Sequence, residues 1–203
     1  LELAKDSAQI LEDLGFDVID LNCGCPVDKV TKDGSGSGLL KTPWLIGEIL
    51  HEMVSSVQVP VTVKIRLGWD DHEIVAEKIT RIAEEAGAKA ITIHGRTREQ
   101  GYSGKARWEA IAECKKAARN IKVIGNGDVF TPEDAKGLFE VSGCDGILVA
   151  RGTLGAPFIF EDIAHYLETG KLLERSEADI LQVFKEHFAI VCDWTEDRKA
   201  LLD

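Results

Sequence analysis

The segment Val18-Ile19-Asp20-Leu21-Asn22-Cys23-Gly24-Cys25-Pro26-Val27 decides the fold. Its first residues are mostly apolar and predict a buried strand. The glycine and proline that follow predict a sharp turn. Barrels of alternating strands and helices carry their catalytic groups at such strand ends. We therefore interpret Cys25, next to the rigid Pro26, as a candidate catalytic thiol; an inert buried cysteine is the alternative.

The same pattern of strand, turn and helix repeats along the chain. Strands are predicted at residues 17–22, 59–67, 90–94, 121–124 and 146–150, each followed by a helix. This alternation predicts a parallel sheet with right-handed connections, and apolar segments predict strands covered on both faces. We expect an α/β fold, a partial TIM (β/α)8 barrel of about the last five βα units. An open doubly wound sheet is the alternative, although no glycine fingerprint follows the first strand.

Three other segments carry expectations about local structure. Residues 1–15 predict a helix with an apolar side that includes Leu3 and Ile10. Residues 71–86 predict a second amphipathic helix. The glycines and serines at 34–38 predict a flexible loop.

The end of the chain predicts a change of domain. An acidic connection after Gly170 leads to an amphipathic helix at about 178–194. We expect a barrel domain at 1–175, without its first strands, and the first part of an α-helical domain at 176–203. Because a partial barrel leaves a sheet edge uncovered, residues 1–203 alone are expected to be poorly stable or to pair with a second copy through that edge.

The composition of the chain argues against several classes of function. The net charge of −11 over 203 residues argues against a protein that binds nucleic acid with its whole surface, although basic residues gather in the loop after residue 94. The 5 cysteines are odd in number and scattered, which indicates reduced thiols and a cytoplasmic protein. We see no zinc-like spacing, no secretory signal and no apolar run of bilayer length, so we expect neither a metal nor a membrane.

Polar residues end every predicted strand. In a barrel these carboxyl ends meet at one mouth, so their side chains are expected to form one site. Lys64 is the strongest single candidate for a functional role, because burying an ammonium inside a barrel is costly unless an anion binds to it. The alternative is a structural ion pair between Lys64 and a neighbouring strand. The strand-end residues are Asn22, Cys25, Lys64, Arg66, His94, Arg96, Asn126, Asp128 and Arg151.

The last two strand ends are typical of a phosphate site. Gly125-Asn126-Gly127 and Arg151-Gly152 combine a guanidinium with small residues, which let backbone N–H groups approach an anion. Barrel phosphate sites commonly use the loops after the seventh and eighth strands. These segments would lie there if the last predicted strand is the eighth.

Five segments together resemble the tRNA-dihydrouridine synthases, in particular their bacterial-type branch. The resemblance covers nearly the whole chain in the same order, and Tyr102-x-Gly104 and Trp108 match the family's loop after the histidine strand. The segments are Asn22-x-Gly24-Cys25-Pro26-Val27, Lys64-Ile65-Arg66-Leu67-Gly68, Ile93-His94-Gly95-Arg96-Thr97-Arg98, Gly125-Asn126-Gly127-Asp128 and Ala150-Arg151-Gly152.

The resemblance implies an activity. Members are flavoenzymes with an FMN-binding barrel and a helical domain, and they reduce the C5–C6 double bond of uridines in tRNA, with NADPH as the reductant. A hydride passes from FMNH2 to C6 of the uracil, and Cys25 matches the acid that protonates C5. A thiol suits that step because its ordinary pKa, about 8.5, leaves it mostly protonated at neutral pH.

The resemblance also implies binding roles. Asn22 matches a position that holds the uracil, and Arg96 and Arg98 are candidates for a phosphate of the tRNA or flavin. The implied FMN contacts are Lys64 and His94 at the flavin ring, and Asn126, Gly127, Asp128, Arg151 and Gly152 on the ribityl and phosphate side. The segment 32–38 departs from the family, because relatives carry alanines among these glycines.

Three alternative functions stay open at this point. The first is a related FMN barrel that acts on a free pyrimidine, as dihydroorotate and dihydropyrimidine dehydrogenases do. The second is a lyase that uses Lys64 as a Schiff base. The third is a catalytically silent fragment that binds tRNA. The sequence indicates no obligate protein partner and does not tell which uridine would be modified.

Overall fold

The computed structural model of the protein describes residues 1–194. The strands in this part of the chain are β1 (Ile19–Cys23), β2 (Val61–Arg66), β3 (Ala90–His94), β4 (Lys122–Asn126) and β5 (Gly146–Leu148). They form one parallel sheet in the order β1-β2-β3-β4-β5. Because the spatial order follows the chain order, this is barrel topology; a doubly wound sheet would reverse direction at a switch point.

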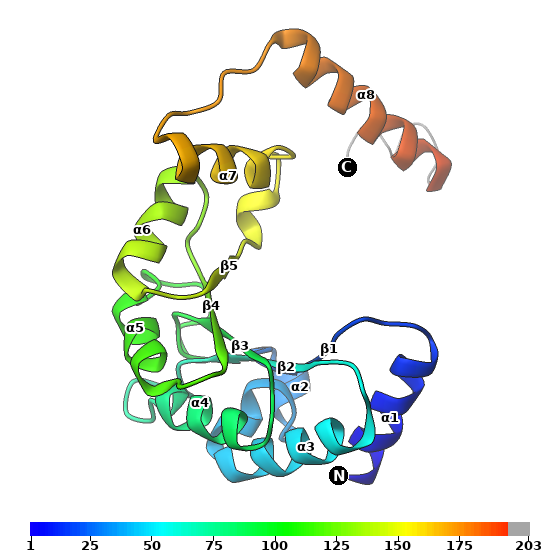
Figure 1. Ribbon diagram of the computed structural model, residues 1–203, viewed down its shortest axis with the longest axis vertical. Coiled ribbons are helices and arrows are strands. Elements are labelled where there is room, and N and C mark those ends of the chain that lie inside the picture. The colour runs from blue at the N-terminus through cyan, green and yellow to red at the C-terminus, as the bar shows by residue number, and fades with distance from the viewer. Residues whose placement is uncertain (195–203) are drawn as a thin grey trace.

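The helices of residues 1–194 are α1 (Glu2–Asp13), α2 (Asp28–Thr31), α3 (Pro43–Ser56), α4 (Ala76–Glu85), α5 (Trp108–Ala117), α6 (Pro132–Ser142), α7 (Ile159–Thr169) and α8 (Glu177–Trp194), with short 3-10 helices η1 (Gly36–Lys41) and η2 (Arg151–Thr153). Figure 1 shows the strands as an arc with α3 to α6 along its outer side. Successive helices from α3 to α7 contact one another. The fold is therefore a partial β/α barrel, as predicted.

Burial alternates along the first two strands. In β1, Ile19 is buried and Asp20 is exposed. In β2, Val63 and Ile65 are fully buried, whereas Lys64 between them is only partly so. Alternate side chains point to opposite faces of a strand, so the apolar set packs on the helices and the polar set lies on the concave face. The prediction that these strands are apolar throughout and covered on both faces is therefore wrong.

Two local predictions are wrong because distant backbone contacts decide the structure. The segment 34–38 is not a flexible loop: η1 begins at Gly36, and Ser37 is completely buried. The helix expected at 71–86 begins only at Ala76, since the N–H groups of Val75 and Ala76 both donate to the Leu67 carbonyl, at 2.8 and 3.0 Å.

The first helix forms as predicted, but its apolar side is not in the core. Leu3 is 82% exposed and Ile10 is 59% exposed, whereas Ala8 is fully buried. The small alanine packs into the core. Of the side that the helical period indicates, Leu11 packs against the core, whereas Leu3 and Ile10 are exposed.

A single arginine holds the chain between α7 and α8. The Nη2 of Arg175 donates to Glu161 Oε2 at 3.0 Å and to Asp162 Oδ1 at 2.5 Å. Its guanidinium carbon lies 3.8 Å from the centre of the Phe158 ring. This cluster fastens the connection to the start of α7.

The helix α8 confirms the amphipathic helix predicted at 178–194. Figure 1 shows it standing apart from the arc of strands. The rest of the predicted helical domain, residues 195–203, lies outside the described residues, and the domain boundary after residue 175 stays a prediction. Within 1–194, no helix is both long enough and apolar enough to cross a membrane.

Candidate active site

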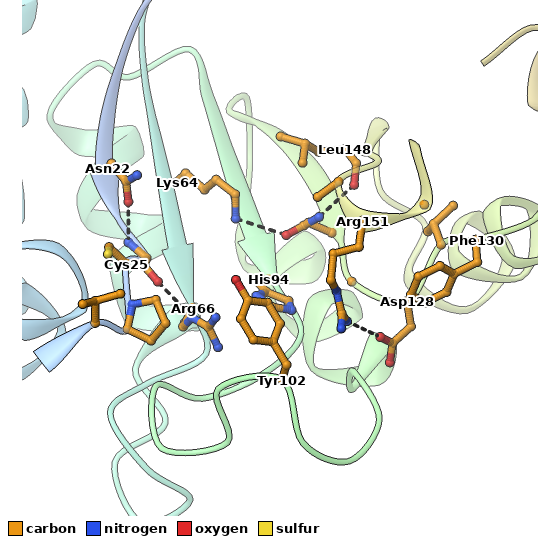
Figure 2. Close-up of a pocket in the computed structure, with 18 residues that line it drawn as sticks. Asn22, Cys25, Lys64, Arg66, His94, Tyr102, Asp128, Phe130, Leu148 and Arg151 are labelled. Atoms are coloured by element: carbon orange, nitrogen blue, oxygen red, sulfur yellow. Dashed lines mark hydrogen bonds and ion pairs between the residues drawn. The ribbon is translucent and has the colours of Figure 1, made fainter. Parts of the chain in front are cut away.

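One cleft collects the carboxyl ends of the strands (Figure 2). Its volume is about 380 Å³, within the usual range of small-molecule sites. The predicted site residues that line it are Asn22, Cys25, Lys64, His94, Asn126, Gly127, Asp128, Arg151 and Gly152.

Strand register brings these residues together. Asn22 pairs with Lys64 across β1 and β2, and His94 pairs with both Arg66 and Asn126 across β2, β3 and β4. Paired residues of parallel strands lie side by side on one face of the sheet. A row of polar side chains therefore follows from the sequence alternation and the parallel pairing alone.

The turn that carries Cys25 is fixed by hydrogen bonds on three sides. The N–H of Gly24 donates to Asn22 Oδ1 at 3.0 Å, and Arg66 Nε donates to the Gly24 carbonyl at 2.9 Å. The carbonyl of Cys25 accepts from both the N–H and the hydroxyl of Ser37, at 3.0 and 2.8 Å. Thus the buried η1 segment, which was expected to be flexible, anchors the thiol.

The two neighbouring thiols have different environments. Cys25 is half-buried and lines the cleft. Cys23 is fully buried in the core, and burial, aided by the charge of Asp20, raises the pKa of its thiol to about 12. An inert thiol is therefore a good description of Cys23, and Cys25 is the one that a ligand can reach.

Removing the Ser37 hydroxyl is expected to loosen the Cys25 turn. Ser37→Ala deletes one of two hydrogen bonds to the Cys25 carbonyl, which should cost about 0.5–1.5 kcal/mol of unfolding free energy and speed alkylation of Cys25 by iodoacetamide. Urea unfolding and the alkylation rate measure the two effects. The matched control is Ser35→Ala, because Ser35 is exposed in the same segment. Equal behaviour of the two variants would contradict this account of the turn.

Lys64 lies in the middle of the cleft and bonds to a neutral amide. Its Nζ donates to Asn126 Oδ1 at 3.1 Å, and Asn126 Nδ2 donates to the Leu148 carbonyl at 2.8 Å. Burial, and then the charge of Arg66, lower the pKa of Lys64 to about 8, although Asp20 acts in the opposite direction. The carboxylate of Asp20 accepts from the Thr62 hydroxyl at 2.7 Å. Lys64 thus presents an ammonium that an anionic ligand would stabilise.

His94 is held neutral by its surroundings. Burial, followed by the charges of Arg66, Lys64 and Arg96, lowers the pKa of its imidazole to about 3, and Asp128 only partly opposes them. The residue as a whole is 7% exposed, and it lines the cleft. A neutral imidazole has one donor and one acceptor nitrogen, so His94 can direct an N–H or a lone pair at a ligand, but not both from one atom.

This pKa predicts a stability change in mild acid. The unfolded chain protonates His94 below pH 6.5, whereas the folded flavin-free protein does so only near pH 3, so the folded state loses stability as the pH falls through that window. We expect His94→Gln to remove up to about 1.4 kcal/mol per pH unit from the slope of unfolding free energy between pH 6.5 and 5. Urea unfolding at several pH values tests this.

The matched control for that experiment is His72→Gln, because His72 is exposed on the loop after β2. It should keep the slope of the unaltered protein. An unchanged slope in His94→Gln would show that the cluster of cations does not hold the His94 ring neutral.

The far end of the cleft combines a guanidinium with two glycines that have no room for a side chain. A Cβ on Gly152 would lie 2.1 Å from the carbonyl oxygen of Val129, and one on Gly127 would lie 2.7 Å from the Ala106 Cβ. Arg151 reaches Asp128 Oδ1 at 3.4 Å, with 43% of its side chain exposed. The two glycines thus let neighbouring parts of the chain pack closely at this end of the cleft; that their backbone N–H groups bind an anion stays a prediction.

The carboxylate of Asp128 bonds to several protein groups and does not stand unpaired. Its φ of +57° is rare for a residue other than glycine. Its Oδ2 accepts from Arg96 at 2.8 Å and from the Ala106 N–H at 2.7 Å. Burial acts to raise the pKa of Asp128, but these hydrogen bonds and the charges of Arg96 and Arg151 outweigh it and lower the pKa below its ordinary value.

The structure places Arg96 and Arg98 outside the lining of the cleft. The Arg96 side chain is 3% exposed, and its guanidinium donates hydrogen bonds to protein groups. Arg98 pairs with Asp28, and its guanidinium carbon lies 4.5 Å from the centre of the Trp69 ring. A direct phosphate contact by Arg96 therefore has no support in this geometry.

Arg66, which was expected among the strand-end residues of the site, also lines the cleft, on the same face of β2 as Lys64. Other lining residues were not among those predicted. Tyr102 comes from the long loop after β3, and its ring centre lies 4.7 Å from the Arg151 guanidinium carbon and 6.4 Å from the His94 ring. No periodic signal in the sequence indicates where such a loop folds. Phe130 and Leu148 also line the cleft.

Fold and site define a class: a β/α-barrel protein with a polar, cation-lined cleft at the carboxyl ends of its strands. Solved structures support the fold alone. A phosphonopyruvate hydrolase complex with oxalate and Mg²⁺ matches with a TM-score of 0.55 and 18% identity, covering 92% of this chain and 78% of that one. A phosphoenolpyruvate phosphomutase from Streptomyces platensis subsp. rosaceus matches with a TM-score of 0.50 and 22% identity, covering 69% and 54%.

Sequence comparison gives the family. The family model described as Dihydrouridine synthase (Dus) matches residues 1–203, and the chain belongs to this family. It is 43% identical over 198 residues to "Probable tRNA-dihydrouridine synthase 1" of Synechocystis sp., and 41% identical over 189 residues to tRNA-dihydrouridine synthase B of Pseudomonas syringae pv. tomato. These alignments cover 97% and 93% of this chain. The chain spans 56% of the length of either relative.

Proposed function

We propose that this chain is the catalytic barrel of a tRNA-dihydrouridine synthase, which reduces the C5–C6 double bond of a uridine in tRNA. One observation carries the proposal: in a member of this family, the fixed thiol of Cys25 and the ammonium of Lys64 line the same cleft. Such a reduction needs two groups from the protein: a proton donor and a cation that can contact an anionic cofactor.

The residues of the cleft fit FMN, the cofactor that the family resemblance implies. Lys64 lies within the cleft with a neutral hydrogen-bond partner, and Arg151 and the crowded glycines Gly127 and Gly152 form its far end. Lys64 and His94 would hold the flavin ring. Asn126, Gly127, Asp128, Arg151 and Gly152 would hold the ribityl and phosphate side. When bound and reduced by NADPH, FMN would supply the hydride for C6 of the uracil.

Cys25 supplies the proton in this proposal. Its S–H bond breaks as a C–H bond forms at C5, and the thiolate that is left takes a proton from water. The thiol needs a fixed position more than an altered acidity, because a proton transfer requires hydrogen-bond reach. The hydrogen bonds of Gly24 and Ser37 to this turn provide that fixed position.

Asn22 orients the uracil. Its Oδ1 accepts from the Gly24 N–H, which leaves the Nδ2 group to donate to a carbonyl oxygen of the base. Tyr102 adds an aromatic surface beside Arg151, on which a flat base can stack. The net charge of −11 gives the chain as a whole little attraction for tRNA, so binding would depend on local basic groups around the cleft.

The test is the visible absorption spectrum of the purified protein. We expect flavin bands that NADPH bleaches and that tRNA, but not free uracil or orotate, restores, with dihydrouridine formed in the tRNA. Restoration by a free pyrimidine would favour the dehydrogenase alternative. A colourless protein that cannot be loaded with FMN would contradict the proposal. Borohydride trapping of a carbonyl substrate on Lys64 would then support the lyase. The lowered pKa of Lys64 would also suit formation of a Schiff base.

A further inference from the structure

Arg96 is buried beside the cleft and contacts four protein groups. Its Nη2 donates to Asp128 Oδ2 at 2.8 Å and to the Gly104 carbonyl at 2.5 Å, and its Nε donates to the Ser103 carbonyl at 3.2 Å. Three acceptors therefore fix the plane of the guanidinium. The remaining nitrogen, Nη1, lies 3.4 Å from Nε2 of His94.

This contact decides where the His94 ring carries its proton. A guanidinium has only N–H donors and no acceptor. An N–H on Nε2 would point a second donor at Nη1, and a doubly protonated ring would bring two positive charges together. Only a bare Nε2 lone pair can accept from Arg96, so the single proton of a neutral His94 belongs on Nδ1.

The opposite nitrogen of the ring is free to meet a ligand. His94 lines the cleft, and Figure 2 shows its ring behind Tyr102 and close to Arg66. Within the described part of the chain, Arg96 is the only hydrogen-bond partner of the ring. An N–H on Nδ1 is thus unpaired by protein and can donate to a carbonyl oxygen or a ring nitrogen of a bound molecule.

We propose that Arg96 is a positioning residue that holds His94 in the tautomer with its proton on Nδ1, so that His94 offers a hydrogen-bond donor to the ligand. A ligand with an acceptor atom at this point is favoured, and one that presents an N–H there is rejected, because two facing donors leave a buried group unpaired. That the ligand is FMN rests on the proposed function; the tautomer itself does not.

Asp128 and the loop after β3 have a role in this arrangement. Asp128 Oδ2 neutralises Arg96 while its Oδ1 faces Arg151 at the far end of the cleft. Ser103 and Gly104, whose carbonyls accept from Arg96, directly follow Tyr102 in this loop. The guanidinium that sets the His94 tautomer therefore also fixes the loop that covers the ring.

The test is a long-range ¹H–¹⁵N correlation spectrum of ¹⁵N-histidine-labelled protein, recorded without flavin or tRNA. The chain has 5 histidines, and the His94 signals are those lost in His94→Gln. We expect the Nδ1–H form of His94 to exceed the Nε2–H form by about tenfold or more, since one charged hydrogen bond separates them. In Arg96→Met the ratio should fall at least to about equality.

The matched control is Arg98→Met, which removes a guanidinium of the same loop that pairs with Asp28 instead of His94, and it should leave the His94 tautomer unchanged. An Nε2–H form in the unaltered protein, or an unchanged ratio in Arg96→Met, would overturn the proposal. If Arg96→Met does not fold, the tautomer of His94 in the unaltered protein still tests the proposal. Because flavin and tRNA are absent from the sample, a failure of the proposed function would not alter this result.

Discussion

Replacing Cys25 by serine is expected to lower dihydrouridine formation in tRNA by about 10² to 10⁴-fold, the usual contribution of a general acid. A serine hydroxyl occupies nearly the same place, so the turn fixed by Ser37 should survive, but it is a far weaker acid than a thiol. Binding of FMN and its bleaching by NADPH should be unchanged. Single-turnover formation of dihydrouridine, set against the rate of flavin bleaching, separates the two effects.

The neighbouring thiol is the matched control for that variant. Cys23→Ala removes a buried thiol two residues away, in the core rather than in the cleft. It should lower stability and leave turnover by the folded protein intact. If Cys25→Ser keeps full activity, or if Cys23→Ala loses as much activity as Cys25→Ser, the proton at C5 does not come from Cys25.

Gly152→Ala is expected to weaken FMN binding. The new Cβ would lie 2.1 Å from the Val129 carbonyl oxygen and 3.1 Å from the Val149 Cγ1, so the loops after β4 and β5 must move apart. Both loops line the cleft. We expect a loss of about 1–3 kcal/mol in unfolding free energy from overpacking, and FMN affinity weaker by at least about tenfold, which corresponds to 1.4 kcal/mol. Flavin retention through gel filtration and a fluorescence titration measure the affinity.

Gly155→Ala separates crowding from backbone strain. Gly155 has a φ of +69°, and no atom of residues 1–194 lies within 4 Å of the position of a Cβ. An alanine there should cost about 1–2 kcal/mol for the left-handed conformation and leave FMN binding intact. If both variants keep their flavin, the close approach at Gly152 does not shape the cofactor site.

The strands and their order were predictable because local signals specify them. β-Branched runs mark the strands, and alternating helices leave few topologies other than a barrel. The beginning of α4 was not predictable, since it depends on a carbonyl, that of Leu67, which lies eight residues before Val75 in the chain. Helical periodicity contains no information about such a contact. The buried η1 segment was missed for the same reason, because its anchor is the Cys25 carbonyl.

The positions of the site residues were predictable or not for the same reason. Asn22, Lys64 and His94 face the cleft because strand alternation and parallel register put them there. Arg96 would share the face of His94 if the strand continued. Instead, its N–H donates to the His94 carbonyl at 2.7 Å, and this tight turn directs the side chain under the loop. The sequence indicated Arg96 as a candidate for a phosphate contact, but the position of its side chain depends on a turn that the strand pattern does not predict.

The attachment of α8 through Arg175 has a mechanical consequence. The 18 residues of α8 make a lever roughly 27 Å long. Turning this lever by about 10° at its first residue would swing its far end by about 5 Å, close to one helical turn. The contacts of Arg175 with Glu161, Asp162 and the Phe158 ring join the segment just before this lever to the start of α7, so a small change in them would be amplified at its far end.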